Sequence, residues 1–431
     1  MTESDTVSHA CAQSALRKVR WRIIPFLFLL YIVAYLDRVN VGFAALDMNR
    51  DLGFTAEVYG LGSGIFFLSY TLLEVPSNLL LARLGARLWI ARIMLTWGLL
   101  SACMVFVNSA ATFYLLRFVL GAAEAGFFPG VILYLTRWFP APERARAIAL
   151  FMTATAMAGV IGAPVSSGLL HLDGAFGLRG WQWLFIAEGL PAVLLAPVVL
   201  RYLTERPEDA AWLTPDEREW LSRTMNEEQA QRSGAHLTLA EAAQSGRLWA
   251  LAMLYFCLVI AFYGVGFWLP QILQAAGTLS SATIVLLSAL PYVAATVGMV
   301  IIGVHSDRTG ERRWHVAAPA LIGAIGFVLT VVAPSTVPIS LSTLSIAALG
   351  IWGALGPFWT IPPAFLRGTA AAGGIALVNS VGNLGGFAGP YLVGYVRDAT
   401  GSFGGGLLVL AAALVVGAGI ALSLRPSSTA A

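Results

Sequence analysis

Long apolar stretches recur along this chain, and they constrain its fold more than any other feature. A helix that crosses the hydrocarbon core of a lipid bilayer needs about 20 mainly apolar residues. Twelve segments meet this requirement, at residues 22–46, 57–81, 88–107, 112–135, 146–170, 181–203, 247–273, 282–304, 314–333, 337–362, 369–395 and 403–424. We therefore expect an all-α integral membrane protein with twelve transmembrane helices.

The composition excludes a water-soluble protein. Charged residues make up only 11% of the chain, hydrophobic residues make up 58%, and the mean hydropathy is +0.76. A soluble domain carries about 25% charged residues, so this chain cannot cover itself with a water-compatible surface. The net charge of +3 is too small to indicate nucleic acid as a partner.

Motifs for catalysis, metal binding and ATP use are missing from the sequence. The three cysteines, Cys11, Cys103 and Cys257, show neither a metal-ligand spacing nor a disulfide framework. There is no Gly-Lys-Ser/Thr phosphate-binding loop, and no pair of nucleophile and base stands outside the apolar segments. We therefore expect neither an enzyme nor an ATP-driven pump, and we expect no cofactor and no metal.

The positive charges predict the orientation in the membrane. Four basic residues at 17–22 precede the first apolar segment, which lacks a small-residue cleavage site and is expected to remain as a transmembrane helix. If both termini are cytoplasmic, most of the 26 Lys and Arg residues fall on the cytoplasmic side, as the positive-inside rule requires. The cytoplasmic tails are then residues 1–21 and 425–431.

A charged loop at residues 204–246 separates two bundles of six predicted helices, residues 22–203 and 247–424. Within the loop, Thr214 is a predicted N-cap, followed by proline at the first helical position and by Glu217 as the capping-box acid. We expect a cytoplasmic amphipathic helix here. A solvated linker is the favoured interpretation of this loop, and a gate or latch is the alternative.

The two halves repeat a short loop pattern. The first half contains Arg83, Gly85 and Arg87 after its second helix, and the second half contains Asp307 and Arg308 at the matching place. Two repeated bundles are the arrangement in which a transporter alternates access by rocking one bundle against the other. We therefore treat these five residues as candidate gating-loop residues.

Six ionisable residues lie inside the predicted membrane segments. Each costs at least about 2.5–3.5 kcal/mol to insert, so such residues mark transport pathways by default. They are Asp37, Arg38, Glu74, Arg117, Glu124 and Glu188. Arg117 and Glu124 are seven residues apart and share a helix face, and Arg38 shares one with Tyr35.

If the charged faces of segments 22–46 and 112–135 point at a shared cavity, the guanidiniums of Arg38 and Arg117 and the carboxylates of Asp37 and Glu124 meet in it, which suggests a division of labour. An arginine fork binds a carboxylate with two hydrogen bonds, so we interpret Arg38 and Arg117 as substrate-binding residues. Asp37 and Glu124 are interpreted as proton-coupling residues, with structural ion pairs as the alternative. For Glu74 a structural cap and a proton site are equally plausible, and Glu188 is expected to be structural and to lie near the outer interface.

Further polar residues are candidates for the same cavity. Asn379 and Asn383 stand one turn apart on segment 369–395 and can donate to carboxylates or hydroxyls, although helix–helix hydrogen bonds explain them equally well. Tyr35 and Tyr70 complete the predicted substrate-binding set.

Several longer motifs carry a family resemblance. They are YLDRVN at 35–40, RFVLGAAEAGFFPG at 117–130, WFPAPERARA at 138–147 and GWQWLFIAEG at 180–189. Together with the loop at 303–313, they resemble the anion:cation symporter family of the major facilitator superfamily over essentially the whole chain. Ala82 departs from the loop pattern, which usually has an acid at that place, so we expect any charge latch in this loop to be weakened or absent. The family includes bacterial permeases for tartrate, phthalate, hexuronates, aldarates and hydroxyphenylacetate.

The resemblance implies two six-helix, pseudo-symmetric bundles, a monomer, and arginines and acids at these positions that contact substrate and carry protons. We expect proton-coupled uptake of a small organic anion across the lipid bilayer of a bacterial inner membrane. Two arginines can neutralise two carboxylates, which favours tartrate or a similar hydroxy-dicarboxylate. The alternatives are symport of an aromatic carboxylate such as phthalate, hydroxyphenylacetate or a nicotinate-like acid, and export or exchange on the same fold, which the glycine-proline stretch at 159–168 favours.

Overall fold

The computed structural model describes residues 3–232, 244–365 and 369–424. Within these ranges every regular element is an α-helix or a short 3-10 helix. The predicted tail at 425–431, residues 233–243 of the predicted linker, and Arg367, one of the basic residues that the predicted orientation places in the cytoplasm, lie outside the described residues. The all-α prediction is therefore confirmed for the described chain.

Two groups of helices follow one another in the sequence. The first group comprises α1 (Glu3–Leu52), α2 (Ala56–Leu84), α3 (Ala86–Ala102), α4 (Ala110–Glu124), α5 (Phe127–Trp138), α6 (Ala141–Met152), α7 (Ala154–Leu170) and α8 (Gly180–Tyr202). The second comprises α11 (Gly246–Ala275), α12 (Ser281–Leu287), α13 (Ala289–Thr309), α14 (Trp314–Val332), α15 (Val337–Phe365), α16 (Thr369–Asn383), α17 (Gly385–Thr400) and α18 (Gly404–Ser423). Helix α9 (Pro215–Arg232) lies between them in the chain.

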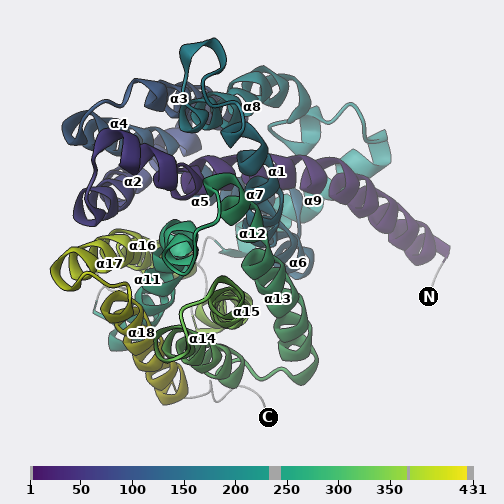
Figure 1. Ribbon diagram of the computed structural model, residues 1–431. Coiled ribbons are helices and arrows are strands. Elements are labelled where there is room, and N and C mark those ends of the chain that lie inside the picture. Colours follow the sequence, from purple (N-terminus) through teal and green to yellow (C-terminus); the bar gives the residue numbers. More distant parts are fainter. Residues whose placement is uncertain (1–2, 233–243, 366–368, 425–431) are drawn as a thin grey trace.

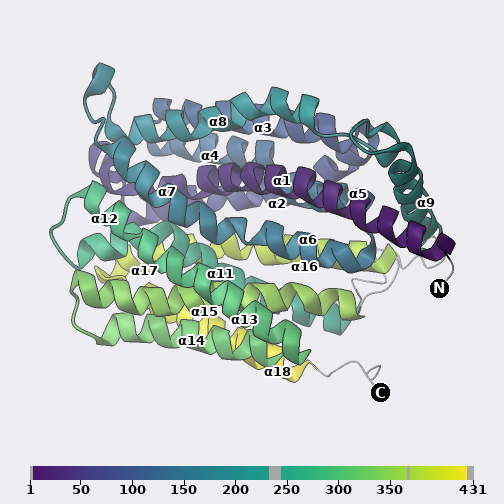
Figure 2. The same ribbon diagram turned by 90° about the vertical axis from the view of Figure 1, so that its right-hand side faces the viewer.

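The two groups lie side by side, with their long axes roughly parallel (Figures 1 and 2). Figure 2 shows α9 beside the start of α1 at one end of the molecule, and α12 at the other end. We call the first the linker end and the second the far end. Helices α1, α2 and α7 face the second group, so these helices position any site between the groups.

Eleven helices among the described residues are long and apolar enough to cross a membrane. They match eleven of the twelve predicted segments. The remaining segment, 369–395, is also helical, and it is interrupted where α16 ends at Asn383 and α17 begins at Gly385, as the spans made of α4 with α5 and of α12 with α13 are interrupted. A helix interrupted in this way is tolerated in a membrane where neighbouring helices satisfy the freed backbone groups.

Helix α9 is docked on the first group rather than free in solvent, which differs from the favoured interpretation of the linker. Glu217 accepts hydrogen bonds from Lys18 at 2.8 Å and from Ser14 at 2.7 Å, both in the N-terminal part of α1. Glu228 pairs with Arg144 of α6 at 2.7 Å. The helix begins at Pro215, as predicted, because the Thr214 amide donates to the Glu217 carboxylate and the Glu217 amide donates to the Thr214 hydroxyl.

The docking of α9 should depend on the charge of Glu217. Partial burial would raise the pKa of Glu217, but hydrogen bonds from Lys18, the Thr214 amide and Ser14 outweigh it and lower that pKa from 4.5 to about 2. A carboxylate with a lowered pKa stabilises the fold fully above its unfolded pKa, and the contribution is lost as the pH falls toward the folded value. Docking should therefore persist at neutral pH and weaken between about pH 4.5 and pH 2.

Glu217→Gln should loosen α9 at neutral pH, which hydrogen–deuterium exchange over residues 215–232 measures directly. Glu219→Gln is the matched control, because Glu219 is exposed on the same helix. Equal exchange in the two variants would contradict a docking role for Glu217.

The far end is closed by a tight seam between α2 and α17. A Cβ atom at Gly60 would lie 2.6 Å from the carbonyl oxygen of Pro390, and one at Gly394 would lie 2.3 Å from that of Ala56. Asp398 of α17 also accepts hydrogen bonds from two amides in the first turn of α2, at 3.2 and 2.7 Å. Small residues allow helix backbones to approach this closely.

Candidate functional site

A polar cavity lies between the two groups, midway along the helices. Its lining comes from both groups and comprises Tyr31, Tyr35, Arg38, Tyr70, Phe128, Met152, Thr155, Tyr255, Val259, Phe262, Tyr263, Leu355, Asn379 and Asn383. A water-sized sphere can enter about 40 Å³ of it, which is room for two or three water molecules. A larger ligand therefore requires the groups to move apart.

Five of the six predicted substrate-binding residues line this cavity. They are Tyr35, Arg38, Tyr70, Asn379 and Asn383, which come from α1, α2 and α16. The sixth, Arg117, is not among the lining residues. The structure thus brings together residues that are more than 300 positions apart in the sequence.

Arg38 is the central charge of the cavity and forms an ion pair with Glu124. It also donates a hydrogen bond to the Tyr263 hydroxyl at 2.9 Å. Arg38 is 5% exposed and Glu124 is 1% exposed, so the pair is buried. Glu124 is the last residue of α4. The helix ends there because Gly126 adopts a left-handed backbone conformation with a φ of 89°, which favours glycine.

Two donors beside the cavity are unsatisfied within the described residues. The Tyr35 hydroxyl and the Arg38 Nε have no hydrogen-bond partner, although both atoms are buried. A buried polar group without a partner is costly, so such groups are rare in a native structure. The two donors are therefore available to a ligand with acceptor oxygens.

Arg117 lies toward the far end and does not reach the cavity. Its side chain donates to the backbone carbonyls of Gly62 at 3.3 Å and Ser63 at 3.1 Å, and it stacks over the Phe66 ring. Arg117 and Glu124 share a face of α4, but seven residues correspond to about 10 Å along a helix. Sharing a face therefore does not bring the two side chains into contact.

Asp37 points away from the cavity, into the first group. It accepts hydrogen bonds from Trp97 at 2.7 Å and Ser101 at 2.8 Å, both on α3. Neighbouring residues of a helix face different directions, so Asp37 and Arg38 have different partners. Of the four charges that we expected to meet, the structure joins only Arg38 and Glu124 in an ion pair within the described residues.

The two remaining membrane acids are both buried. Glu188 is 4% exposed and accepts a hydrogen bond from Ser166 at 2.5 Å, so it lies in the helix packing and not at the outer interface where we expected it. Glu74 accepts hydrogen bonds from Asn379 at 2.5 Å and from Ser380 at 3.1 Å. Glu74 thus joins α2 of the first group to α16 of the second.

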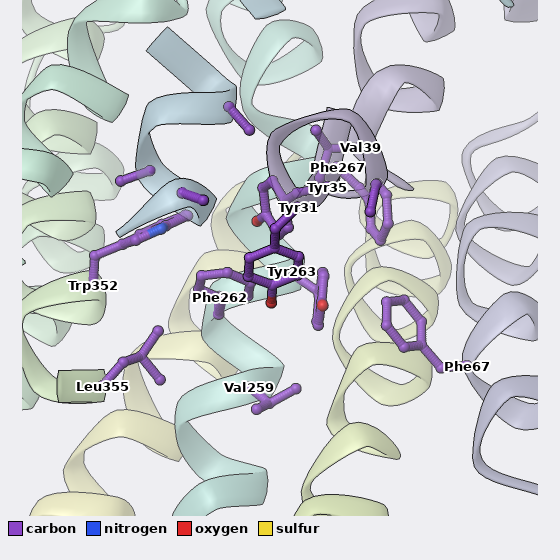
Figure 3. Close-up of a cluster of buried hydrophobic side chains, with 14 of the residues drawn as sticks. Tyr31, Tyr35, Val39, Phe67, Val259, Phe262, Tyr263, Phe267, Trp352 and Leu355 are labelled. Carbon is purple, nitrogen blue, oxygen red and sulfur yellow. The ribbon is translucent and has the colours of Figure 1, made fainter. Parts of the chain in front are cut away.

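The aromatic wall formed by α11 was missed from the sequence. Tyr255, Phe262 and Tyr263 line the cavity, and Figure 3 shows Phe262 and Tyr263 close to Tyr31 and Tyr35 of α1. The Tyr263 ring centroid lies 4.3 Å from that of Phe67. Tyr255 and Tyr263, eight residues apart in the apolar middle of α11, were the signal available in the sequence, because tyrosine hydroxyls need polar partners when buried.

The predicted gating loops lie at the linker end. Arg83 and Arg308 are exposed in the last turns of α2 and α13, and Asp307 pairs with Arg312 at 2.7 Å. Gly85 takes a φ of 93° between α2 and α3.

Glu205 of the linker provides a carboxylate at the first loop, where Ala82 stands in place of the usual acid. Glu205 accepts hydrogen bonds from the backbone amides of Ala86 at 3.0 Å and Arg87 at 2.9 Å, and it forms an ion pair with Arg137. A carboxylate at a helix N-terminus is favourable because it meets free amides and the positive end of the helix dipole. The charge contact in the first loop is thus present, contrary to our expectation from Ala82.

Membrane-crossing helices around a central polar cavity define a multi-pass membrane transporter. The profile of the Major Facilitator Superfamily matches residues 27–390. The chain belongs to this superfamily, and it is a transporter rather than an enzyme.

Curated relatives match nearly the whole chain. A protein of Agrobacterium vitis named "Putative tartrate transporter" is 50% identical over 99% of this chain and 94% of its own length. The "Putative metabolite transport protein NicT" of Pseudomonas putida is 44% identical over 94% of this chain and 93% of its own. The "Quinolone resistance transporter" of Acinetobacter baumannii is 40% identical over 94% of this chain and 93% of its own length.

A solved structure shares the fold. The inward-facing, occupied form of a bacterial homologue of the human lysosomal transporter Spinster superposes with a TM-score of 0.75, over 94% of this chain and 96% of that one. The two sequences are only 16% identical, so the likeness concerns the fold alone.

Proposed function

We propose that this protein takes up a small organic anion together with protons, across a bacterial inner membrane and by alternating access. The observation that carries the proposal is the buried Arg38 in the central cavity, beside the Tyr35 hydroxyl, which has no hydrogen-bond partner in the described part of the chain. A guanidinium and a hydroxyl are suitable donors for a carboxylate. In this proposal both termini are cytoplasmic, so the linker end faces the cytoplasm, and the protein works as a monomer.

Tartrate or a similar hydroxy-dicarboxylate is the proposed substrate. The relative named after tartrate supports this choice, and so does the presence of a second buried arginine. Arg117 has no carboxylate partner within the described residues, and a buried cation without a counter-ion favours a nearby anion. We propose that Arg117 binds the second carboxylate when the groups rearrange.

An aromatic carboxylate is the second candidate, because Tyr31, Tyr255, Phe262 and Tyr263 give the cavity an aromatic wall. Export or exchange is the third, and the relative named after quinolone resistance supports it. Liposomes that contain the purified protein and a pH dye separate these candidates. Internal acidification after addition of tartrate, phthalate, hydroxyphenylacetate or nicotinate identifies a proton symporter and its substrate class. Labelled-anion exchange without acidification would instead identify an exchanger.

Glu124→Gln should abolish accumulation driven by a pH gradient and spare anion exchange. Glu124 is the carboxylate that pairs with the substrate-binding Arg38. We therefore propose that the proton that is transported with the anion binds to Glu124. Uptake of labelled anion with and without a pH gradient measures both activities. Glu208→Gln, an exposed glutamate of the linker, is the control. Normal pH-driven accumulation by Glu124→Gln would remove Glu124 as the proton site.

A further inference from the structure

Glu74 bridges the two helix groups on the linker side of the cavity. It is 3% exposed and belongs to α2, whereas both of its hydrogen-bond donors, Asn379 and Ser380, belong to α16. The bond from Asn379 Nδ2 to Glu74 Oε1 is 2.5 Å long, and the bond from Ser380 Oγ to Glu74 Oε2 is 3.1 Å long. Both carboxylate oxygens are therefore used in holding the two groups together.

The interface between α2 and the second group consists of backbone contacts toward the far end and of side-chain hydrogen bonds toward the linker end. Toward the far end, the glycine seam brings the backbones of α2 and α17 into direct contact, as at Gly60 and Gly394. At the level of Glu74 the link to α16 is made by side chains. A seam of interlocked backbones separates only if whole helices shift, whereas a hydrogen-bonded side-chain bridge opens when its bonds exchange for bonds to water.

The same bridge touches the cavity. Asn379 lines the cavity and donates one of its two amide hydrogens to Glu74. Arg38 of α1, Tyr70 of α2 and Tyr255 of α11 are the charged and titratable groups around this carboxylate. An anion that binds in the cavity thus competes with Glu74 for Asn379 and for the positive charge of Arg38.

We propose that Glu74 is the inner gate residue of this transporter: its hydrogen bonds to Asn379 and Ser380 hold the linker side of the cavity closed, and their release opens the cavity to the linker end. This inference rests on the proposed function for the direction in which substrate leaves. Glu74 acts through Asn379 and Ser380, so it is a positioning residue for the cycle. Its partner Asn379 is shared by the gate and the binding site.

The distance between the linker-side parts of α2 and α16 tests the gate. Spin labels replace Leu80 and Ala376, which are both exposed, in a background where Cys11, Cys103 and Cys257 are serines. Pulsed electron paramagnetic resonance then reports the distance distribution in liposomes without any substrate.

Asn379→Asp should widen this distribution by several ångströms at a pH where both carboxyl groups are ionised, because two carboxylates that repel then replace a donor–acceptor pair. Glu74→Ala should widen it as well. The double variant Glu74→Gln with Asn379→Asp exchanges donor and acceptor across the interface, so it should restore the distance of the parent protein. Asn383→Asp adds the same charge one turn away, without a hydrogen bond to Glu74, and should leave the distance unchanged.

Restoration by the double variant would show that the loss of this donor–acceptor pair, and not a general loosening of the fold, opens the linker side. An unchanged distance in Asn379→Asp and Glu74→Ala, or a double variant as open as Asn379→Asp, would overturn the gate. The measurement needs no transport activity. A parent protein that moves none of the tested anions would therefore overturn the proposed function and leave the gate proposal standing on the measured distances.

Discussion

Arg38→Ala is expected to abolish anion uptake and to lower the free energy of unfolding by about 3–5 kcal/mol, because it leaves Glu124 buried without its counter-ion. The same change removes the Arg38 hydrogen bond to Tyr263 and the guanidinium of the cavity. Both effects come from one side chain, so a second variant must separate them.

The double variant Arg38→Gln with Glu124→Gln provides that separation. Two amides can form a neutral hydrogen bond in place of the buried ion pair, so most of the stability should return while uptake stays absent. Thermal unfolding followed by tryptophan fluorescence measures stability, and liposome uptake measures function. Arg50→Ala is the control, because Arg50 forms an exposed pair with Asp47 whose loss should cost no more than about 1 kcal/mol. Uptake by the double variant would refute the role of Arg38 in binding.

Gly394→Val is expected to stop transport by preventing closure of the far end. Its side chain would occupy the place where the Ala56 carbonyl oxygen lies, 2.3 Å from the new Cβ. Real Cβ contacts are never this short, so α2 and α17 must separate. The transporter should then remain open at the far end, with anion binding retained and uptake lost.

Labelling of a cysteine at Asn49 measures this opening. Asn49 is half-buried at the interface between α1 and α11, where it hydrogen-bonds to Gln271 at 3.4 Å. A membrane-impermeant maleimide should react with Asn49→Cys faster in the Gly394→Val background. Gly419→Val in α18 is the control, since no atom lies within 4 Å of its Cβ position. Parent-like labelling and uptake in Gly394→Val would contradict the seam as the far-end closure.

The membrane segments and the residues that could matter were predictable from the sequence. Hydropathy is a sum over neighbouring residues, and the bilayer sets the length of an apolar helix, so eleven predicted segments coincide with membrane-length helices and the twelfth is helical in two parts. The cost of burying a charge singled out Arg38 and Glu124 as candidate functional residues before any contact was known. The start of α9 at Pro215 followed from its capping residues alone.

The partners of those residues were not predictable. Arg38 and Glu124 are 86 positions apart, and Glu74 and Asn379 are 305 positions apart, so no spacing rule connects them. Asp37 and Arg117 were expected to face the cavity. Asp37 instead hydrogen-bonds to Trp97 and Ser101 on α3, and Arg117 to carbonyls of α2.

The sequence by itself determined that the chain is helical, where its membrane segments lie and which few charges they contain, because each of these properties depends on residues that are close together in the chain. Only the tertiary structure decided that Arg38 meets Glu124, that Glu74 joins the two helix groups, and that Glu205 replaces the acid missing at Ala82. Such contacts depend on how each helix is rotated about its axis and packed against helices that are distant in sequence. Packing of whole helix faces sets that rotation, and no short stretch of sequence contains it.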